Sequence, residues 1–320
     1  MDIAIWGAGS VGLGLATCLA RDGEPLLVVG RDPETIASIE RDGLERSGIF
    51  GERHVPPSGL VMTDRPRALV DARPDWILVC TKGFASPEIA RALEPIHTKL
   101  PDTTHLVLCQ NGWGNETPFL PFWPRERLLH ARVITGFHRR SPNRVEITAH
   151  ASPIALGSVF DVDPGSVPGL ERLATRITEG GIPAETTPGM RAVLWGKMLY
   201  NCSLNPIGAL TGRRYGELAE DPTTRQIVDG VIREIFVVLE AASMPSGWSD
   251  AETYLRHFHE VLIPPTARHE SSMLQDLRAG RRTEIEALCG AVEALGAEHG
   301  VATPIVSSLA SLVRAAERAD

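Results

Sequence analysis

A lysine and two asparagines are spaced four residues apart in residues 194–206, which read LWGKMLYNCSLNP. If this segment is a helix, Lys197, Asn201 and Asn205 lie along one face of it, because a helical turn takes 3.6 residues. The residues between them are mainly apolar, so we expect the helix to be largely buried. A buried lysine and two buried amides cost free energy unless they meet a polar ligand. The stripe therefore predicts a pocket lining; a solvated helix face is the alternative.

A glycine-rich turn near the start of the chain is typical of a dinucleotide site. Residues 7–12 read GAGSVG, directly after the strand-like DIAIW and before a helical pattern. In such a turn Gly7 permits the tight bend, Gly9 lets backbone N–H groups approach a pyrophosphate, and Gly12 lets the helix pack closely. A glycine-rich turn without a nucleotide is the alternative. The cofactor-binding residues predicted here are Gly7, Gly9, Ser10, Val11 and Gly12.

The residues at the end of the second expected strand distinguish NAD from NADP. An NAD enzyme usually has Asp or Glu there, which accepts a hydrogen bond from the ribose 2′-hydroxyl. This chain has Arg31 instead, and a guanidinium can pair bidentately with a 2′-phosphate. Asp32 follows and could be the missing acid, but Asp32-Pro33 is typical of the N-cap and first position of a helix. The sequence therefore favours NADP.

The first half of the chain alternates strand-like and helical segments, which is typical of βαβ units and a mostly parallel sheet. Residues 128–159 read as successive strands, and we expect them to be antiparallel additions at one edge of the sheet. The other expected strands are 2–6, 25–29, 76–81, 105–109 and 184–187, and the expected helices are 11–21, 33–41 and 167–179.

From residue 190 onward the apolar residues recur only at helical spacing, and Pro188-Gly189 breaks the chain just before. The expected helices are 190–204, 222–242, 251–262, 271–278, 284–299 and 305–319. We predict an α/β protein with an N-terminal Rossmann-type dinucleotide-binding domain over residues 1–188. An all-helical C-terminal domain over residues 189–320 would carry the substrate and catalytic residues.

Composition excludes several classes of protein. A chain of 320 residues is long enough for two domains. Its net charge of −8 argues against a general nucleic-acid binder, because contacts to phosphates need positive charge. No apolar run approaches the roughly 18 residues that span a bilayer, and the first residues lack the basic start of a signal peptide. We therefore expect a cytoplasmic protein. Its five cysteines include no close pair, so neither a disulfide framework nor a zinc site is expected.

Five motifs, in their order and spacing, resemble the ketopantoate reductases (2-dehydropantoate 2-reductases), which are related to 6-phosphogluconate dehydrogenase. They are GAGSVG, Thr81-Lys82, the QNGWG of residues 110–114, the LWxKxxxNxxxNP helix and the SSMLQDLRAGRRTE of residues 271–284. The resemblance spans nearly the whole chain. It implies a Rossmann-type domain followed by a helical domain, and NADPH-dependent reduction of ketopantoate to pantoate on the route to pantothenate and coenzyme A.

The same resemblance implies the catalytic residues. Lys197 would donate a proton to the 2-oxo group, or polarise it, as hydride arrives from the nicotinamide, and Glu284 would contact the substrate or Lys197. An oxo group that becomes an alkoxide needs an acid or a cation beside it, so the pair makes chemical sense.

The resemblance also implies the binding residues. Asn201 and Asn205 would hydrogen-bond the substrate and Ser272 would bind its carboxylate. Asn111 would lie between the nicotinamide and the substrate, and Lys82 near the cofactor. The expected partners are a small 2-oxo acid and a second copy of the chain in a homodimer, with no nucleic acid, membrane or metal.

Two of these residues have structural alternatives. Thr283 and Glu286 match a capping box, in which Glu284 would be a first-turn acid; if Glu286 serves the cap, Glu284 is available for chemistry. Ser272 follows another serine, Ser271, so the choice of hydroxyl stays open, and both could simply begin a helix. His257 and His259 diverge on a helix, so we expect no metal there.

Two departures from the family leave the identity of the acid open. His269 stands where the family often has Asn, and residues 134–148 lack the usual glycine-rich form. The alternatives are a reductase of a different 2-oxo acid on the same scaffold and a non-catalytic NADP-binding redox sensor. The sensor is disfavoured by the presence of Lys197, Asn201, Asn205 and Glu284, because a sensor needs no proton donor.

Overall fold

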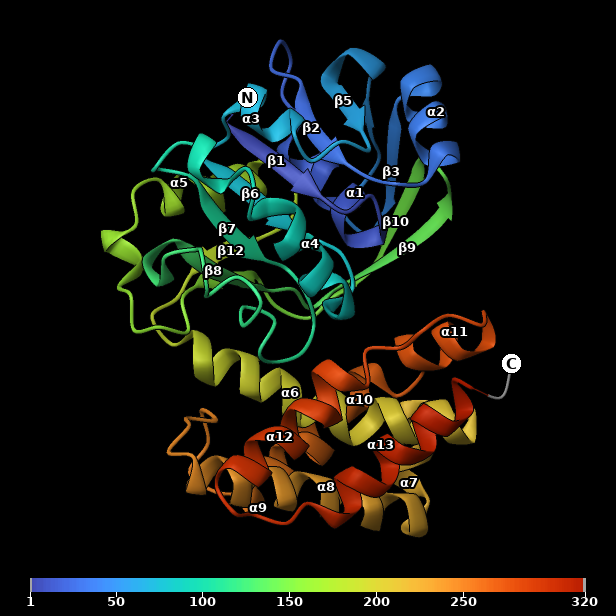
Figure 1. Cartoon of the computed structure of the whole chain (residues 1–320). Coiled ribbons are helices and arrows are strands. Elements are labelled where there is room, and N and C mark those ends of the chain that lie inside the picture. The colour runs from blue at the N-terminus through green and yellow to red at the C-terminus, as the bar shows by residue number, and fades with distance from the viewer. Residues whose placement is uncertain (1, 319–320) are drawn as a thin grey trace. The chain divides into compact units, whose positions relative to one another are not determined.

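The computed structural model describes residues 2–318 and consists of two compact units. The first comprises the chain up to Gln110 together with Asn115–Met190, and the second comprises Asn111–Gly114 together with the chain from Arg191 onward. The first unit is built of strands and helices, whereas the second is helical (Figure 1). The predicted fold class is confirmed.

The main sheet of the first unit is parallel over most of its width. Its central strands pair in parallel because short helical crossovers return the chain to the same edge. The strands are β1 (Ile3–Trp6), β2 (Leu26–Val29), β5 (Leu60–Thr63), β6 (Trp76–Val79), β7 (His105–Leu108), β8 (Leu128–Arg132), β11 (Ile154–Gly157) and β12 (Ala184–Thr186), in the order β12-β11-β8-β7-β6-β1-β2-β5. Strand β1 lies between β2, the next strand along the chain, and β6, which comes later. The order of the strands therefore reverses at β1. Such a switch point is where open α/β sheets bind ligands.

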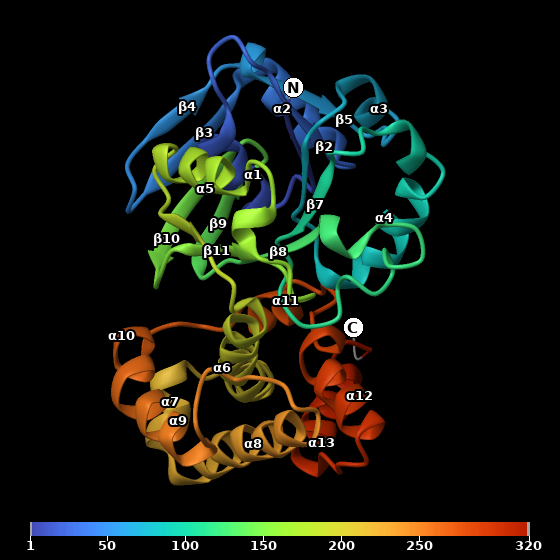
Figure 2. The same ribbon diagram turned by 90° about the vertical axis from the view of Figure 1, so that its left-hand side faces the viewer.

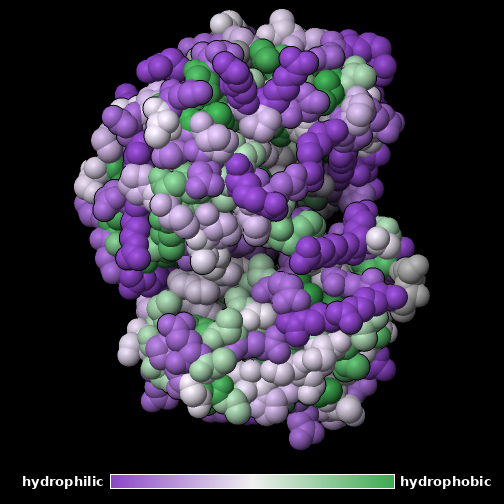
Figure 3. Space-filling model, in the orientation of Figure 1, coloured by the Kyte–Doolittle hydropathy of each residue, from purple (hydrophilic) through white to green (hydrophobic). Residues whose placement is uncertain are grey.

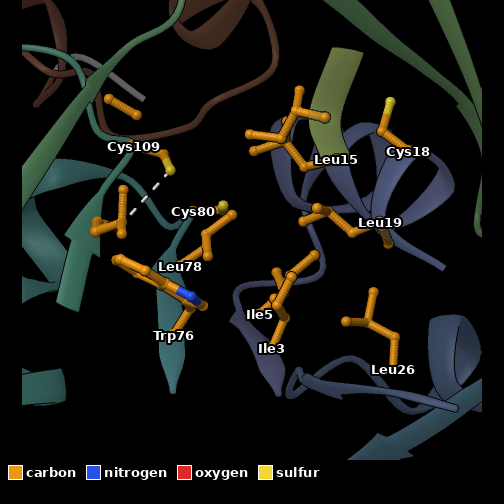
Figure 4. Packing of buried hydrophobic residues seen from close by; sticks show 14 of the residues in the cluster. Ile3, Ile5, Leu15, Cys18, Leu19, Leu26, Trp76, Leu78, Cys80 and Cys109 are labelled. Atoms are coloured by element: carbon orange, nitrogen blue, oxygen red, sulfur yellow. Dashed lines mark hydrogen bonds between the residues drawn. The ribbon is translucent and has the colours of Figure 1, made fainter. Parts of the chain in front are cut away.

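Both faces of this sheet are covered. Ile3 and Ile5 of β1 belong to one hydrophobic cluster, while Ala4 and Trp6 belong to another on the opposite face. Figure 4 shows part of the first cluster, in which the two isoleucines lie near Leu19. The covering helices are α1 (Ser10–Leu19), α2 (Pro33–Asp42), α3 (Ala68–Ala72), α4 (Ser86–Leu93) and α5 (Leu170–Glu179), with short 3₁₀ turns η1 (Pro57–Gly59), η2 (Gly83–Ala85), η3 (His97–Lys99), η4 (Arg125–Arg127) and η5 (Pro164–Ser166).

The prediction for residues 128–159 was wrong in part. Strand β8 runs parallel to β7, and within residues 128–159 only β11 joins the main sheet antiparallel to its neighbour, with β12 beyond it in the same direction as β11. The hairpin β9 (Thr135–Ser141) and β10 (Arg144–His150) instead joins β3 (Leu44–Gly48) and β4 (Arg53–Val55) in a second sheet of order β4-β3-β10-β9 (Figure 2). The cause is a strand that the sequence did not reveal, because β3 offers β10 a parallel partner.

The helical unit has one core. Buried side chains from α6, α8 and the C-terminal helices pack together, among them Trp195, Ile235 and Leu288. Its helices are α6 (Met190–Thr211), α7 (Tyr215–Glu220), α8 (Pro222–Ala241), α9 (Ala251–His257), α10 (Ile263–Thr266), α11 (Ser272–Arg278), α12 (Ala291–Glu298) and α13 (Pro304–Ala316), with π-helical turns η6 (Phe258–Leu262) and η7 (Glu286–Gly290). Helix α6 continues past the predicted end at residue 204 and through Pro206. Burial of Ile207 and Ala209 beyond the proline explains why the helix persists.

The surface carries scattered apolar residues. On the face shown in Figure 3, hydrophobic residues are interspersed among hydrophilic ones. None of the helices described over residues 2–318 is long and apolar enough to cross a membrane.

Candidate active site

The glycine turn of the first unit has the geometry of an anion cradle. Gly7 has φ 120° and its N–H donates to the Val29 carbonyl at 2.8 Å. A Cβ on Gly12 would lie 1.9 Å from the Gly7 carbonyl oxygen, so only glycine fits there. A Cβ on Gly9 would meet nothing within 4 Å, which leaves that side open to a ligand. Gly9 is also the N-cap of the ten-residue helix α1 and supplies no capping oxygen. The first N–H groups of α1, at Ser10 and Val11, therefore suit a pyrophosphate.

A glutamine braces the neighbouring strand ends. The buried side chain of Gln110, directly after β7, accepts a hydrogen bond from Ser86 Oγ at 3.0 Å. Its Nε2 donates to Thr81 Oγ1 and to the Lys82 carbonyl, both at 3.2 Å. The backbone that carries Lys82 is thus held at the carboxyl edge of β6. The sequence showed Gln110 only as part of a motif and gave no sign of this bracing role.

Arg31 and Asp32 lie at the end of β2 and have different partners. Arg31 is exposed and pairs with Glu88 of α4 at 2.5 Å. Asp32 is the N-cap of α2, as predicted, and accepts a hydrogen bond from the Glu34 N–H at 3.3 Å. Hydrogen bonds from Thr35 and Arg139 lower the pKa of Asp32 below its ordinary value. Asp32 is therefore an ionised carboxylate committed to protein donors.

Three residues far apart in the sequence meet in the helical unit. Lys197 Nζ of α6 donates to Asn111 Oδ1 at 2.5 Å, and Asn111 Nδ2 donates to Glu284 Oε2 at 3.0 Å. Glu284 is buried and Lys197 is half-buried. Because the carboxylate accepts from the amide nitrogen, the amide oxygen is turned toward the ammonium. The arrangement holds a lysine nitrogen in a defined position within a partly buried polar chain.

A π-helical turn docks the segment that carries Asn111. The Trp113 N–H donates to the carbonyl of Ala287, within η7, at 2.9 Å. Gly112 has φ 98°, and a Cβ on it would lie 2.3 Å from the same carbonyl oxygen. The Trp113 ring also packs against Trp195, with ring centroids 5.1 Å apart. Such turns recur at functional sites, and here the turn begins two residues after Glu284.

The two remaining amides lie further along α6. Asn201 is half-buried, and Asn205 is buried with its Oδ1 accepting from the Tyr215 hydroxyl at 2.6 Å. Burial raises the pKa of Tyr215, so that hydroxyl stays a donor. The Tyr215 ring in turn packs against the ring of His269, with ring centroids 5.0 Å apart. Tyr215 was not predicted as a site residue, because a tyrosine on a short separate helix carries no local signal of this contact.

The two serines at the start of α11 have different environments. Ser271 is the buried N-cap, accepting from the Leu274 N–H at 3.1 Å and donating to the Asn205 carbonyl at 3.4 Å. Ser272 is exposed at the first helical position and takes no part in the cap.

The predicted capping box at Thr283 is wrong. Thr283 Oγ1 accepts from the Ile285 N–H at 3.2 Å, and the Thr283 N–H donates to Glu317 at 2.6 Å. Glu286 instead pairs with Arg314 of α13, at 2.7 and 2.8 Å. A bidentate guanidinium is a stronger partner for a carboxylate than one backbone N–H, which explains why Glu286 pairs with Arg314 and does not accept from the Thr283 N–H.

The histidines considered as metal ligands have other partners. His259 Nε2 lies 2.7 Å from Asp229 Oδ1, and the His257 ring packs against Trp248. Over residues 2–318, no group of three His, Cys, Asp or Glu side chains is arranged to hold a metal ion.

Comparison with known proteins matches both halves of the chain to one family. Residues 3–159 match the family Ketopantoate reductase PanE/ApbA, and residues 189–317 match its C-terminal part. The 2-dehydropantoate 2-reductase of Aquifex aeolicus is 34% identical, over 99% of this chain and 97% of its own. The chain belongs to the ketopantoate reductase family. The Halobacterium salinarum 2-dehydropantoate 2-reductase is 29% identical over 99% of both chains.

Solved structures of this family have the same fold. A ketopantoate reductase family protein from Ralstonia eutropha has a TM-score of 0.83 at 26% identity and covers 99% of this chain, with 98% of its own matched. The 2-dehydropantoate 2-reductase of Geobacter metallireducens has a TM-score of 0.83 at 27% identity, over 99% and 100% of the two chains. A D-mandelate dehydrogenase solved with NADH and anilino(oxo)acetate shares the fold, with a TM-score of 0.85 at 23% identity over 99% and 98%.

Proposed function

We propose that this protein is a 2-dehydropantoate 2-reductase that reduces ketopantoate to pantoate with NADPH. The observation that carries the proposal is the hydrogen-bonded chain from Lys197 through Asn111 to Glu284, which presents a proton donor in a partly buried site. Membership of the ketopantoate reductase family, with a relative of this name at 34% identity, supports the choice of substrate.

The chain's own residues would hold the cofactor and move the proton. Bound NADPH supplies a hydride to the 2-oxo carbon of the substrate. The Lys197 ammonium donates a proton to the 2-oxo oxygen, so the carbonyl becomes a hydroxyl and the lysine becomes an amine. Asn111 and Glu284 keep Lys197 Nζ in place and limit its rotation. The proposed cofactor contacts are Gly7, Gly9, Ser10, Val11, Gly12, Arg31, Lys82 and Asn111.

The substrate groups have matching partners in the helical unit. Asn201 and Asn205 are proposed to hydrogen-bond the substrate, and Ser272 to bind its carboxylate. Asn205 Oδ1 already accepts a hydrogen bond from the Tyr215 hydroxyl. Asn205 Nδ2 is therefore the atom that would donate to the substrate. A different 2-oxo acid on this scaffold is the alternative, because His269 packs against Tyr215, the hydrogen-bond partner of Asn205.

An assay of NADPH consumption against a panel of 2-oxo acids tests the function. We expect ketopantoate to be the best substrate and pantoate to be the product, identified by mass spectrometry. Faster turnover of another 2-oxo acid would identify that acid as the substrate. Tight NADPH binding without turnover of any acid would favour the redox sensor.

Arg31 carries the prediction on cofactor choice. Replacing Arg31 by alanine should weaken NADPH binding by about tenfold or more, since a charge-assisted bond to a 2′-phosphate contributes about 1.5–3 kcal/mol. NADH binding should change little. The exposed pair with Glu88 is weak enough for a phosphate to displace it. Fluorescence titration with both cofactors is the measurement, with Arg41→Ala on α2 as the matched control. Equal affinity of the unmodified protein for NADPH and NADH would contradict the assignment.

Gly112 carries a prediction on positioning. Gly112→Ala should lower kcat by about tenfold or more, because the added Cβ forces the Asn111 segment away from Ala287. NADPH binding should weaken by less than kcat falls, because Asn111 is one proposed cofactor contact among several. The matched control is Gly300→Ala, since Gly300 also has positive φ, at 67°, but a Cβ there meets nothing within 4 Å. If the two variants lost the same amount of activity, backbone strain and not the docking contact would be responsible.

We propose a homodimer, and sedimentation at the mass of a single chain would contradict it. A cytoplasmic location is supported by the five cysteines, all free and buried, as a reducing compartment permits.

A further inference from the structure

A carboxylate stands where an NADP enzyme should avoid one. Asp32 follows Arg31 directly at the end of β2, the place where NAD enzymes present an acid to the ribose 2′-hydroxyl. A free carboxylate there would repel a 2′-phosphate and favour NADH. The chain must therefore compensate for Asp32 if it is to prefer NADPH, and this inference rests on the NADPH part of the proposed function.

Strand β9 supplies a compensating charge. Arg139 Nη2 lies 3.2 Å from Asp32 Oδ2 and also donates to the Thr35 hydroxyl, which itself donates to Asp32. The Arg139 side chain is 29% exposed. Its Nε donates to the Ser141 carbonyl at 3.3 Å, which fixes the guanidinium on the hairpin.

The neighbouring residue of β9 is a natural comparison. Arg140 is exposed and pairs with Glu146 on β10, within the hairpin. Successive side chains of a strand point to opposite faces, so only Arg139 faces the start of α2. Further charged groups near this end of β2 are Glu34 in the first turn of α2, the Arg31–Glu88 pair, and Asp64 and Arg65 after the neighbouring strand β5.

We propose that Arg139 is a cofactor-specificity residue that acts through Asp32. It neutralises the carboxylate and holds it on the N-terminus of α2, so that a 2′-phosphate can bind Arg31 without repulsion. The recognised group is the 2′-phosphate of NADPH, and Arg139 is a positioning residue that need not touch it. Strand β9 thereby gains a role in cofactor choice.

Fluorescence titration of the full-length protein with NADPH and NADH, without a 2-oxo acid, tests the proposal. Arg139→Gln keeps a hydrogen-bond donor but removes the charge, and should weaken NADPH binding by roughly fivefold at low salt while NADH binding stays equal or tightens. Arg140→Gln is the matched control and should change neither affinity.

The decisive variant combines Arg139→Gln with Asp32→Asn. Asparagine still caps a helix but carries no charge, so the double variant should regain the NADPH affinity of the unmodified protein. If the double variant does not regain this NADPH affinity, or if Arg139→Gln weakens the binding of both cofactors equally, the proposal is overturned. Failure of ketopantoate turnover would leave this result standing, because binding is measured without substrate.

Discussion

Replacing Lys197 by alanine should lower kcat by about 100-fold or more, because general acid catalysis typically contributes 10²–10⁴-fold. NADPH binding should be nearly unchanged, since the glycine turn and Arg31 belong to the other unit. The measurement is steady-state NADPH consumption with ketopantoate, together with a cofactor titration of the same variant.

Two further variants separate chemistry from folding. Lys197→Met keeps the length of the side chain and its apolar contacts, so it should melt near the temperature of the unmodified protein and still lose activity. Lys99→Ala, at an exposed lysine in η3, is the control and should be fully active. Turnover of Lys197→Met at a near-normal rate would mean that Lys197 is only a residue of the helix face.

The second large effect concerns the hydroxyl of the substrate. We expect kcat/KM for ketopantoate to exceed that for 2-oxoisovalerate, which lacks the terminal hydroxyl, by at least about 100-fold. A site built to hydrogen-bond a hydroxyl leaves buried amides unpaired when the hydroxyl is missing. Asn205 suits this role because it is buried and its amide is already oriented by Tyr215.

Tyr215→Phe provides the matched test of that orientation. The variant removes one hydroxyl from a buried ring and leaves Asn205 free to turn, so the ratio between the two acids should fall. If 2-oxoisovalerate were the equal or better substrate of the unmodified protein, the pocket around Tyr215 and His269 would serve a different acid.

Much of the fold could be predicted because its signals are local. The helix at residues 33–41 was expected from Asp32-Pro33, and α2 begins at Pro33 with Asp32 as its N-cap. The apolar run at residues 76–81 gave β6, which is buried along its whole length. Strand β3 (LERSG) has only two buried residues and no apolar pattern, so the second sheet could not be foreseen.

Features that depend on neighbouring residues could be read from the amino-acid order. GAGSVG specified a glycine turn, and the spacing of Lys197, Asn201 and Asn205 placed three polar groups on one helix, because both follow from backbone geometry over a few residues. Which side chains meet across the helical unit became visible only in the folded chain. Lys197 and Glu284 are joined through Asn111 across separations of 86 and 173 residues, and Thr283 gained Glu317 in place of Glu286. Such hydrogen bonds depend on how whole helices pack, and no pattern within one helix encodes its partner.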